Sequence, residues 1–99
     1  MTAWFVSRHG GAVELAWRRG LDAVATDHLD LDAVLPGDVV IGTLPVGIVA
    51  EVQARGAAFW FLELDLPAAA RGRELSADEM ERCGARLVEY RVERVRQVL

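Results

Sequence analysis

The sequence predicts an α/β fold, a small three-layer Rossmann-like domain with a mainly parallel sheet. Short apolar runs typical of buried strands alternate along the chain with stretches whose apolar residues recur at helical spacing. Glycine or proline stands at most of the junctions between them. Of the 99 residues, 53% are hydrophobic, which is enough for a core without disulfides. We therefore expect residues 1–99 to form a single domain in the order β-α-β-β-α-β-α, with right-handed crossovers.

The first half of the chain supplies three of the expected strands and one helix. Trp4-Phe5-Val6 is an aromatic and β-branched run that favours a buried first strand. Residues 12–19 contain helix formers, and Gly20 is expected to end that helix. A weak second strand is expected over residues 22–26. Residues 39–42 are apolar throughout, as in a strand that is covered on both faces.

The second half predicts two helices and one strand. Thr43 is the expected cap of a helix over residues 46–55, and Gly56 is expected to end that helix. Residues 59–64 are expected to form the fourth strand. Ser76-Ala77-Asp78-Glu79 matches a capping box and opens a final helix that is expected to run to about Val98. The apolar face of this final helix would consist of Met80, Cys83, Leu87, Val88, Val92, Val95 and Leu99.

Three tryptophans and the cysteine are expected to have structural roles. Trp4, Trp17 and Trp60 each lie inside a regular apolar segment, which favours packing in the core over stacking on a nucleotide base. Cys83 falls in the middle of the expected final helix, on its apolar side, where a thiol is inert packing.

Composition excludes several classes of protein. The formal net charge of −4 is unfavourable for binding duplex nucleic acid, whose affinity comes from many phosphate contacts. The single cysteine, Cys83, excludes an internal disulfide and a cysteine-based zinc site. No apolar run approaches the about 20 residues of a membrane span, and the N-terminus lacks a signal peptide. We therefore expect a cytoplasmic protein without a membrane association.

Polar side chains gather where the expected strands end. Ligands of open parallel sheets bind beyond the carboxyl ends of the strands, where the N-termini of helices also point. Three of the expected strands are followed there by unusual polar residues. These residues are Ser7, Arg8 and His9 after the first strand, Thr43 after the third, and Asp65, Arg71 and Arg73 after the fourth.

Ser7-Arg8-His9-Gly10-Gly11 is the most informative of these segments. Arginine presents a planar fork to phosphate, histidine exchanges a proton near neutral pH, and glycines let backbone amides approach an anion. The alternative is a tight turn with a surface arginine and a histidine that caps a carbonyl. Arg71-Gly72-Arg73 offers a second phosphate clamp, or else an exposed loop whose arginines pair with Asp65 or Glu74.

Two other functions of the histidines, in a histidine phosphatase and in a metal site, have less support in the sequence. Arg8-His9-Gly10 after a first strand is similar to the histidine phosphatases, but these need a second histidine, further arginines and a longer chain. His28 either lines the same pocket or lies in an acidic loop. The spacing of Asp27, Asp30 and Asp32 is too short for an EF-hand, so no metal site and no cofactor are expected.

Taken together, the segments resemble a family of small CRISPR-associated accessory proteins found beside type III interference systems. The resemblance covers nearly the whole chain, and one departure is Gly10, where many relatives have proline. Its most specific parts are the exit of the first strand and the block that begins at Gly37. The matching segments are Phe5-Val6-Ser7-Arg8-His9, His28-Leu29-Asp30, Gly37-Asp38-Val39-Val40-Ile41-Gly42-Thr43-Leu44-Pro45, Leu64-Asp65-Leu66-Pro67 and Arg71-Gly72-Arg73-Glu74-Leu75.

Members of that family look like stand-alone relatives of the CARF sensor domains, which are Rossmann-like and dimeric. The resemblance implies a metal-independent ring nuclease that linearises cyclic oligoadenylate, with cyclic tetra-adenylate the preferred messenger, and so switches off antiviral signalling. It implies catalytic roles for His9 and Arg8 in a homodimer that binds the ring on its two-fold axis. Ligand contacts would come from Ser7, Gly10, Gly11, Thr43, Arg71, Gly72 and Arg73.

Two other functions stay open at this point. A binding module could capture cyclic oligoadenylate without cutting it, as a sponge or sensor, because the same arginines serve both activities. A structural or regulatory subunit could instead contact a protein partner through the expected final helix. Turnover under excess substrate distinguishes the enzyme from the sponge, and a nucleotide-dependent rise in melting temperature distinguishes both from the subunit.

Overall fold

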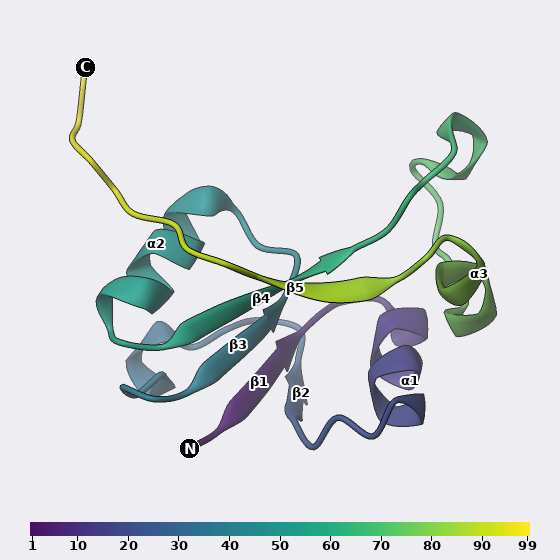
Figure 1. Ribbon diagram of the computed structural model, residues 1–99, viewed down its shortest axis with the longest axis horizontal. Helices are drawn as coiled ribbons and strands as arrows, with labels where there is room; N and C mark the ends of the chain where they lie inside the picture. The colour runs from purple at the N-terminus through teal and green to yellow at the C-terminus, as the bar shows by residue number, and fades with distance from the viewer.

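The structure is a computed structural model that describes residues 1–99, and its centre is a five-stranded sheet with helices on both faces (Figure 1). The strand order is β2-β1-β3-β4-β5, in which the first four strands are parallel and β5 runs antiparallel to β4. The predicted α/β, Rossmann-like architecture with a mainly parallel sheet is confirmed. The strands are β1 (Ala3–Val6), β2 (Val24–Thr26), β3 (Val39–Gly42), β4 (Ala58–Glu63) and β5 (Arg86–Tyr90).

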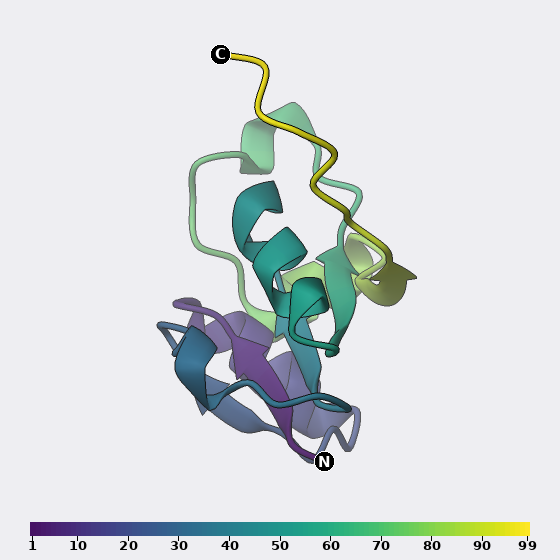
Figure 2. The same cartoon turned by 90° about the vertical axis from the view of Figure 1, so that its left-hand side faces the viewer.

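The helices divide between the two faces of the sheet. Helices α1 (Gly10–Arg18) and α3 (Ala77–Arg82) pack together on one face, over a core that includes Phe5, Leu15 and Ile41. Helix α2 (Val46–Ala54) covers the other face, together with a short 3-10 turn at Leu31–Ala33. Figure 2 shows α2 in front of the sheet and α1 behind it. None of these helices could serve as a membrane span. The core on the α2 face consists of Val6, Val34, Val40, Val49, Val52, Ala57 and Phe59.

The predicted final helix is wrong beyond its second turn. Helix α3 ends at Arg82, and the chain then forms β5, which pairs with β4 in the register Glu63↔Arg86 to Phe59↔Tyr90. Residues 91–99 contain no helix or strand. The element order is therefore β-α-β-β-α-β-α-β. Pairing satisfies the backbone groups along the edge of β4, which a helix in this position would leave open.

Gly84 is the signal that ends α3. Its φ of 72° lies in the left-handed region, its N–H donates to Glu81 O, and the N–H of Ala85 donates to Met80 O. This pair of bonds is a Schellman motif, which closes a helix at glycine. Gly20 and Gly56 end α1 and α2 in the same way, with φ values of 73° and 87°. Those two helix ends are predicted correctly from glycine, and the same rule applied to Gly84 would have ended the third helix.

Trp17 corrects the prediction that all three tryptophans are core residues. Its side chain is 81% exposed, whereas Trp4 and Trp60 are partly buried. The buried face of α1 consists of Ala12, Leu15 and Ala16, and Trp17 points away from these positions. Small alanines let α1 lie close to α3, so the wide indole remains outside. Cys83 is not in the middle of a helix either, because it is the C-cap of α3.

Asp38 is a buried carboxylate that fixes the entry to β3. It accepts hydrogen bonds from Leu35 N (3.0 Å), Thr2 N (2.9 Å) and Trp4 Nε1 (3.3 Å), and it is only 3% exposed. The bond from Leu35 N, followed by the one from Thr2 N, holds the pKa of Asp38 below its ordinary value. This side chain ties the N-terminal residues to the turn before β3 and thereby sets the register of β1 against β3.

Candidate functional site

From β1 the chain adds β2 on one side of the sheet, and from β3 it adds β4 on the other side, so the direction in which strands are added reverses between β1 and β3. The chain leaves β1 toward α1 on one face and leaves β3 toward α2 on the other face (Figure 1). In doubly wound sheets this arrangement opens a crevice beyond the carboxyl ends of the two strands, between the two helix starts, and ligands bind there. The residues that follow β1 and β3 are Ser7-Arg8-His9 and Thr43. The predicted anion-binding residues of these two strands therefore flank the switch point.

The exit of β1 is a hydrogen-bonded turn that leaves two side chains free. The N–H of His9 donates to Ser7 Oγ (3.1 Å), and His9 is the N-cap of α1 with extended backbone angles of −100° and 120°. Its imidazole does not cap the helix. Arg8 and His9 are exposed, and no hydrogen bond or ion pair engages either side chain. Both remain available to a ligand at the start of α1, where the first N–H groups have no partner within the helix.

The two glycines of this turn differ in their surroundings. A Cβ on Gly10 would meet no atom within 4 Å, whereas a Cβ on Gly11 would lie 2.1 Å from the carbonyl oxygen of Leu75. Gly11 thus lets the backbone before α3 pack directly against the start of α1. Because Leu75 and Ala70 are both buried, this contact holds the loop over residues 64–76 beside the exit of β1.

Thr43 stands next to the exit of β1 because β3 ends very close to it. Val6 pairs with Gly42, and a Cβ on Gly42 would lie 2.4 Å from the carbonyl oxygen of Val6. Gly42 is buried and has a φ of 146°, so only glycine suits this position. The sequence predicted Thr43 as the cap of α2, and this prediction is wrong, because the N-cap is Pro45. Thr43 is exposed. Its hydroxyl is therefore free for a ligand.

The two arginines of the loop have different roles. Arg73 forms an ion pair with Glu79 (2.6 Å). This contact is the main reason that the pKa of Glu79 falls from 4.5 to about 2, and the hydrogen bond from Ser76 N adds to it. Arg71 is exposed and forms no ion pair, and Gly72 between them has a φ of 81°. Arg71 is thus the free cation of the loop, and Arg73 is anchored to the capping box.

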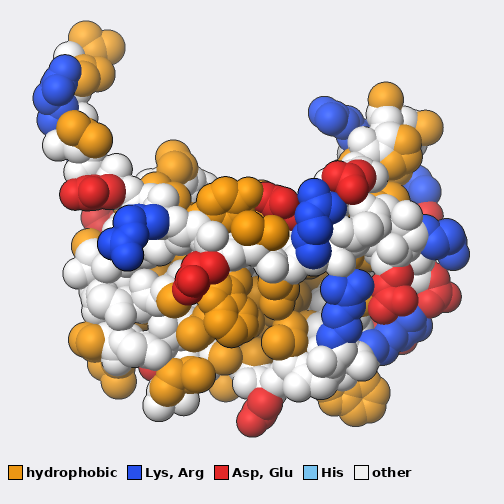
Figure 3. Space-filling view, in the orientation of Figure 1, with side chains coloured by type: hydrophobic (Ala, Val, Ile, Leu, Met, Phe, Trp, Pro, Cys, Tyr) orange, Lys and Arg blue, Asp and Glu red, His pale blue; other side chains and the backbone are white.

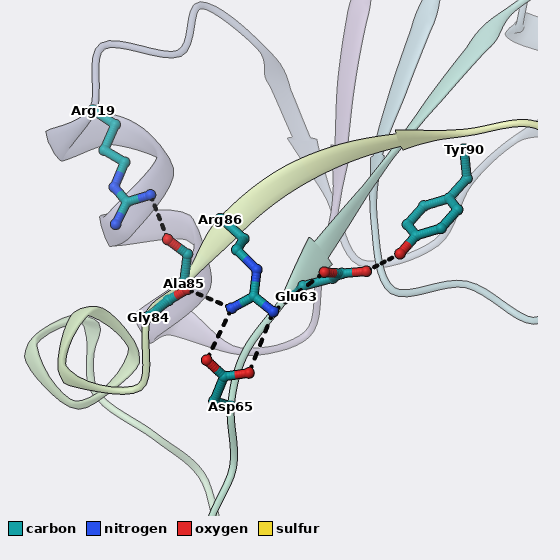
Figure 4. Close-up of polar contacts among 7 residues, drawn as sticks. All are labelled: Arg19, Glu63, Asp65, Gly84, Ala85, Arg86 and Tyr90. Carbon is teal, nitrogen blue, oxygen red and sulfur yellow. Dashed lines mark hydrogen bonds and ion pairs between the residues drawn. The ribbon is translucent and has the colours of Figure 1, made fainter.

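Asp65 does not pair with either loop arginine, because Arg86 of β5 occupies it. Arg86 contacts Asp65 Oδ2 (3.1 Å) and Glu63 Oε2 (3.3 Å), and Tyr90 donates to Glu63 (Figure 4). The contact with Asp65 raises the pKa of Arg86, and the hydrogen bond to Glu63 raises that of Tyr90. Arg19 of α1 adds a bond to the carbonyl oxygen of Ala85 (2.7 Å). Sequence reasoning missed Arg86 because it placed this residue within a helix.

Comparison with known proteins identifies the family of the chain. Residues 4–93 match the sequence model of the family described as "Putative CRISPR-associated protein (Cas_VVA1548)". The chain belongs to this family. No curated protein and no solved structure matches it. The predicted membership of a family of small CRISPR-associated proteins is therefore confirmed. The match includes β1 from Trp4 onward and the other four strands in full.

His28 of this CRISPR-associated chain lies one strand away from the switch point. Thr26-Asp27-His28 repeats the turn of Ser7-Arg8-His9, since the N–H of His28 donates to Thr26 Oγ1 (3.3 Å) at the end of β2. β2 lies on the side of β1 that faces away from β3. His28 is exposed, and no hydrogen bond joins it to His9. The chain therefore contains two histidines in matching turns, of which only His9 follows a strand that pairs with β3.

Two cavities of the CRISPR-associated domain lie beside α2 rather than at the predicted site. The larger has a volume of about 1270 Å³ between α2 and residues 89–94. The smaller, of about 350 Å³, is wholly apolar in its lining and adjoins Leu44 and Val46 at the start of α2. Neither is lined by the predicted catalytic or ligand residues. No three or more His, Cys, Asp or Glu side chains lie close enough together to hold a metal ion.

Proposed function

We propose that this CRISPR-associated protein is a cytoplasmic, metal-independent ring nuclease that cleaves cyclic oligoadenylate, with cyclic tetra-adenylate as its substrate. The observation that carries the proposal is the switch point between β1 and β3, where Arg8 and His9 follow β1 with free side chains and Thr43 follows the neighbouring strand β3. The family match and the resemblance to stand-alone relatives of CARF domains support the same activity. It would end the antiviral signal of type III systems.

The distribution of charge supports a small anionic ligand. The chain as a whole has a formal net charge of −4, yet Arg8 and Arg71 have no carboxylate partner. Glu63 and Asp65, the two acidic residues closest to the end of β4, both pair with Arg86, which offsets one of their two negative charges. A phosphate at the switch point would meet the free guanidinium group of Arg8, and the loop would bring the free guanidinium group of Arg71 to it. Both groups bind phosphate in bidentate fashion.

The proposed reaction is an internal transesterification. A ribose 2′-oxygen attacks the adjacent phosphorus, its proton passes to a base, and the bond from phosphorus to the 5′-oxygen breaks as that oxygen takes up a proton. The product is linear and ends in a 2′,3′-cyclic phosphate. His9 would transfer the proton, and Arg8 would stabilise the charge that develops on the phosphoryl oxygens.

The remaining residues would position the ring. Ser7 and the N–H groups of Gly10 and Gly11 at the start of α1 would hold the reacting phosphate. Thr43 would hold the neighbouring phosphate, and Arg71, next to the flexible backbone of Gly72, would close over the ring. Arg73 would contribute to the same basic surface while it is paired with Glu79. A homodimer would present each of these groups twice, which matches the symmetry of a ring with four phosphates.

The test is cleavage of labelled cyclic tetra-adenylate in EDTA, with substrate in excess over the purified protein. We expect more than one ring to be cut per dimer, with products that end in cyclic phosphate. Binding that saturates at one intact ring per dimer would overturn the enzyme in favour of a sponge. Absence of both binding and cleavage, with other ring sizes and with divalent metal, would overturn the nucleotide function altogether.

The catalytic assignment is tested with matched variants. His9→Ala and Arg8→Ala should each lower the rate at least about 100-fold, because each removes a group that acts in the transition state. His28→Ala is the control for the histidine, since it alters the equivalent turn on β2. Arg82→Ala is the control for the arginine, because Arg82 is exposed and forms no ion pair. Full activity of folded His9→Ala and Arg8→Ala proteins would show the roles to be wrong.

A further inference from the structure

The chain leaves the domain after β5 and exposes large apolar side chains. We define residues 93–99 as the C-terminal segment, in which Val95 is 84% exposed, Val98 74% and Leu99 104%. None of the three belongs to either core. Figure 3 shows the segment rising free of the domain, with hydrophobic and basic side chains on its surface. These residues gain nothing from burial within their own chain, so their apolar surface is available to another molecule.

An apolar groove lies at the root of the same segment. It has a volume of about 350 Å³ between α2 and the end of the sheet, and Val46 on its rim is 71% exposed. The larger cavity of about 1270 Å³ adjoins it and carries Glu51 and Glu89 on the domain side. The lining of the groove is Leu44, Val46, Val49, Phe59, Phe61, Tyr90 and Val92.

Gln53 fixes the direction in which the segment leaves. Its Nε2 donates to the carbonyl oxygen of Tyr90 (2.7 Å), and its Oε1 accepts from the N–H of Val92. Val92 packs against the core of the α2 face and lines one part of the groove. Beyond Arg94 the chain leads away from the domain (Figure 1), and none of residues 93–99 lines the groove. The apolar groups of the segment therefore do not fill the groove beside their own root.

The C-terminal segment and the groove are complementary in their apolar side chains and in their charge. Val95, Val98 and Leu99 stand at positions i, i+3 and i+4, a spacing that would place them on one face if the segment became helical on docking. Arg94 and Arg96 outweigh Glu93 and give the segment a positive charge. In the larger cavity beside the groove, the carboxylates of Glu51 and Glu89 outweigh Arg91. The contact would bury apolar groups centrally and place the opposite charges at its rim.

We propose that the C-terminal segment of one copy docks in the apolar groove of a second copy, and that the exchange is reciprocal. Both halves of the contact belong to the same chain, so a two-fold arrangement satisfies two segments and two grooves at once and closes as a dimer. The proposal gives a contact surface to the homodimer of the proposed function. Its test needs no nucleotide, so its failure is distinct from a failure of the ring nuclease.

The test measures the molar mass of the full chain by sedimentation equilibrium. The unaltered protein should be a dimer, and Val95→Glu in the segment or Val46→Glu in the groove should each weaken association at least about tenfold. Val95 and Val46 are exposed, so both variants should keep the circular dichroism of the folded chain. Trp17→Glu is the control, because it alters an exposed apolar residue on the other face of the sheet.

Mixing the two variants tests the reciprocal arrangement. A Val95→Glu copy retains its groove and a Val46→Glu copy retains its segment, so the mixture should recover one of the two contacts and associate more strongly than either variant alone. The proposal would be overturned if the unaltered protein were a monomer. If, in addition, Val95→Glu lowered the melting temperature of that monomer, the segment would pack on its own chain. Dimers that persist in Val95→Glu and Val46→Glu would place the interface elsewhere, for instance at the edge of β5.

Discussion

Gly10 and Gly11 are neighbours in the same turn, yet only one of them is required by packing. Gly11 faces the carbonyl oxygen of Leu75 at a distance that no Cβ could accept, and Gly10 faces open space. From the sequence both glycines suit an anion that approaches the backbone amides. In the structure Gly11 joins two distant parts of the chain, and through them it sets where Arg71 lies relative to the exit of β1.

Substitution of the two glycines separates these roles. Gly11→Ala should lower the free energy of unfolding by about 1–3 kcal/mol, because the added methyl forces α1 away from the backbone at Leu75. Gly10→Ala should change it by no more than about 1 kcal/mol, since alanine is the better helix former and meets no atom. Urea unfolding of both variants measures the difference. Equal stability of the two would show that the close contact does not exist.

At the scale of elements, α3 is a short helix whose stability depends on its first turn. Ser76 Oγ accepts a hydrogen bond from the N–H of Glu79 (3.2 Å), and the Glu79 carboxylate accepts one from the N–H of Ser76 (3.2 Å). Arg73 adds its ion pair to the same carboxylate. Six residues make few bonds within a helix, so these contacts and the packing of Met80 hold it in place.

The lowered pKa of Glu79 predicts a specific loss of stability in acid. Because the folded value is about 2 and the ordinary value is 4.5, the stabilisation is complete above pH 4.5 and disappears as the pH falls toward 2. Arg73→Ala removes the first cause of the shift. It should lower the melting temperature at pH 7 and have little further effect near pH 2. Arg71→Ala is the control and should leave the pH dependence unchanged, so identical profiles for all three proteins would contradict the ion pair.

At the scale of the whole molecule, the sheet is most stable in its middle and weakest at its ends. β3 lies between β1 and β4 and is covered by helices on both faces, and Val40 and Ile41 are wholly buried. β5 is an edge strand that pairs on one side only. The residues beyond it contact little of the domain. Local opening should therefore become easier from β3 outward to β5 and the C-terminal segment.

Hydrogen exchange of the full chain measures this gradient. The amides of β3 should exchange slowest, and those of residues 93–99 should exchange fastest in dilute protein. Within residues 86–90, protected and unprotected amides should alternate, because successive amides of an edge strand point toward and away from β4. Continuous protection through residues 86–98 would instead be the pattern of a long final helix and would contradict β5.

Local signals in the sequence were sufficient for most of the fold. Apolar runs marked β1, β3 and β4, glycines marked the ends of α1 and α2, and Ser76 with Glu79 marked the start of α3. The polar residues after β1 and β3 were likewise visible, and the strand order brings them to the same end of two neighbouring strands. These predictions hold because the conformation of a strand, a cap or a helix end depends mainly on residues that are close in the chain.

The sequence by itself therefore determined the α/β class, the parallel strands and the candidate residues Ser7, Arg8, His9 and Thr43. Only the tertiary structure decided that residues 86–90 complete the sheet, that Arg73 is engaged by Glu79 while Arg71 is free, and that Arg86 holds Asp65. Helical spacing in Met80, Cys83 and Leu87 suggested a longer helix, but the open edge of β4 offered backbone partners that no local pattern reveals. Contacts between residues far apart in the chain depend on which surfaces the fold brings together, and that is a property of the whole molecule.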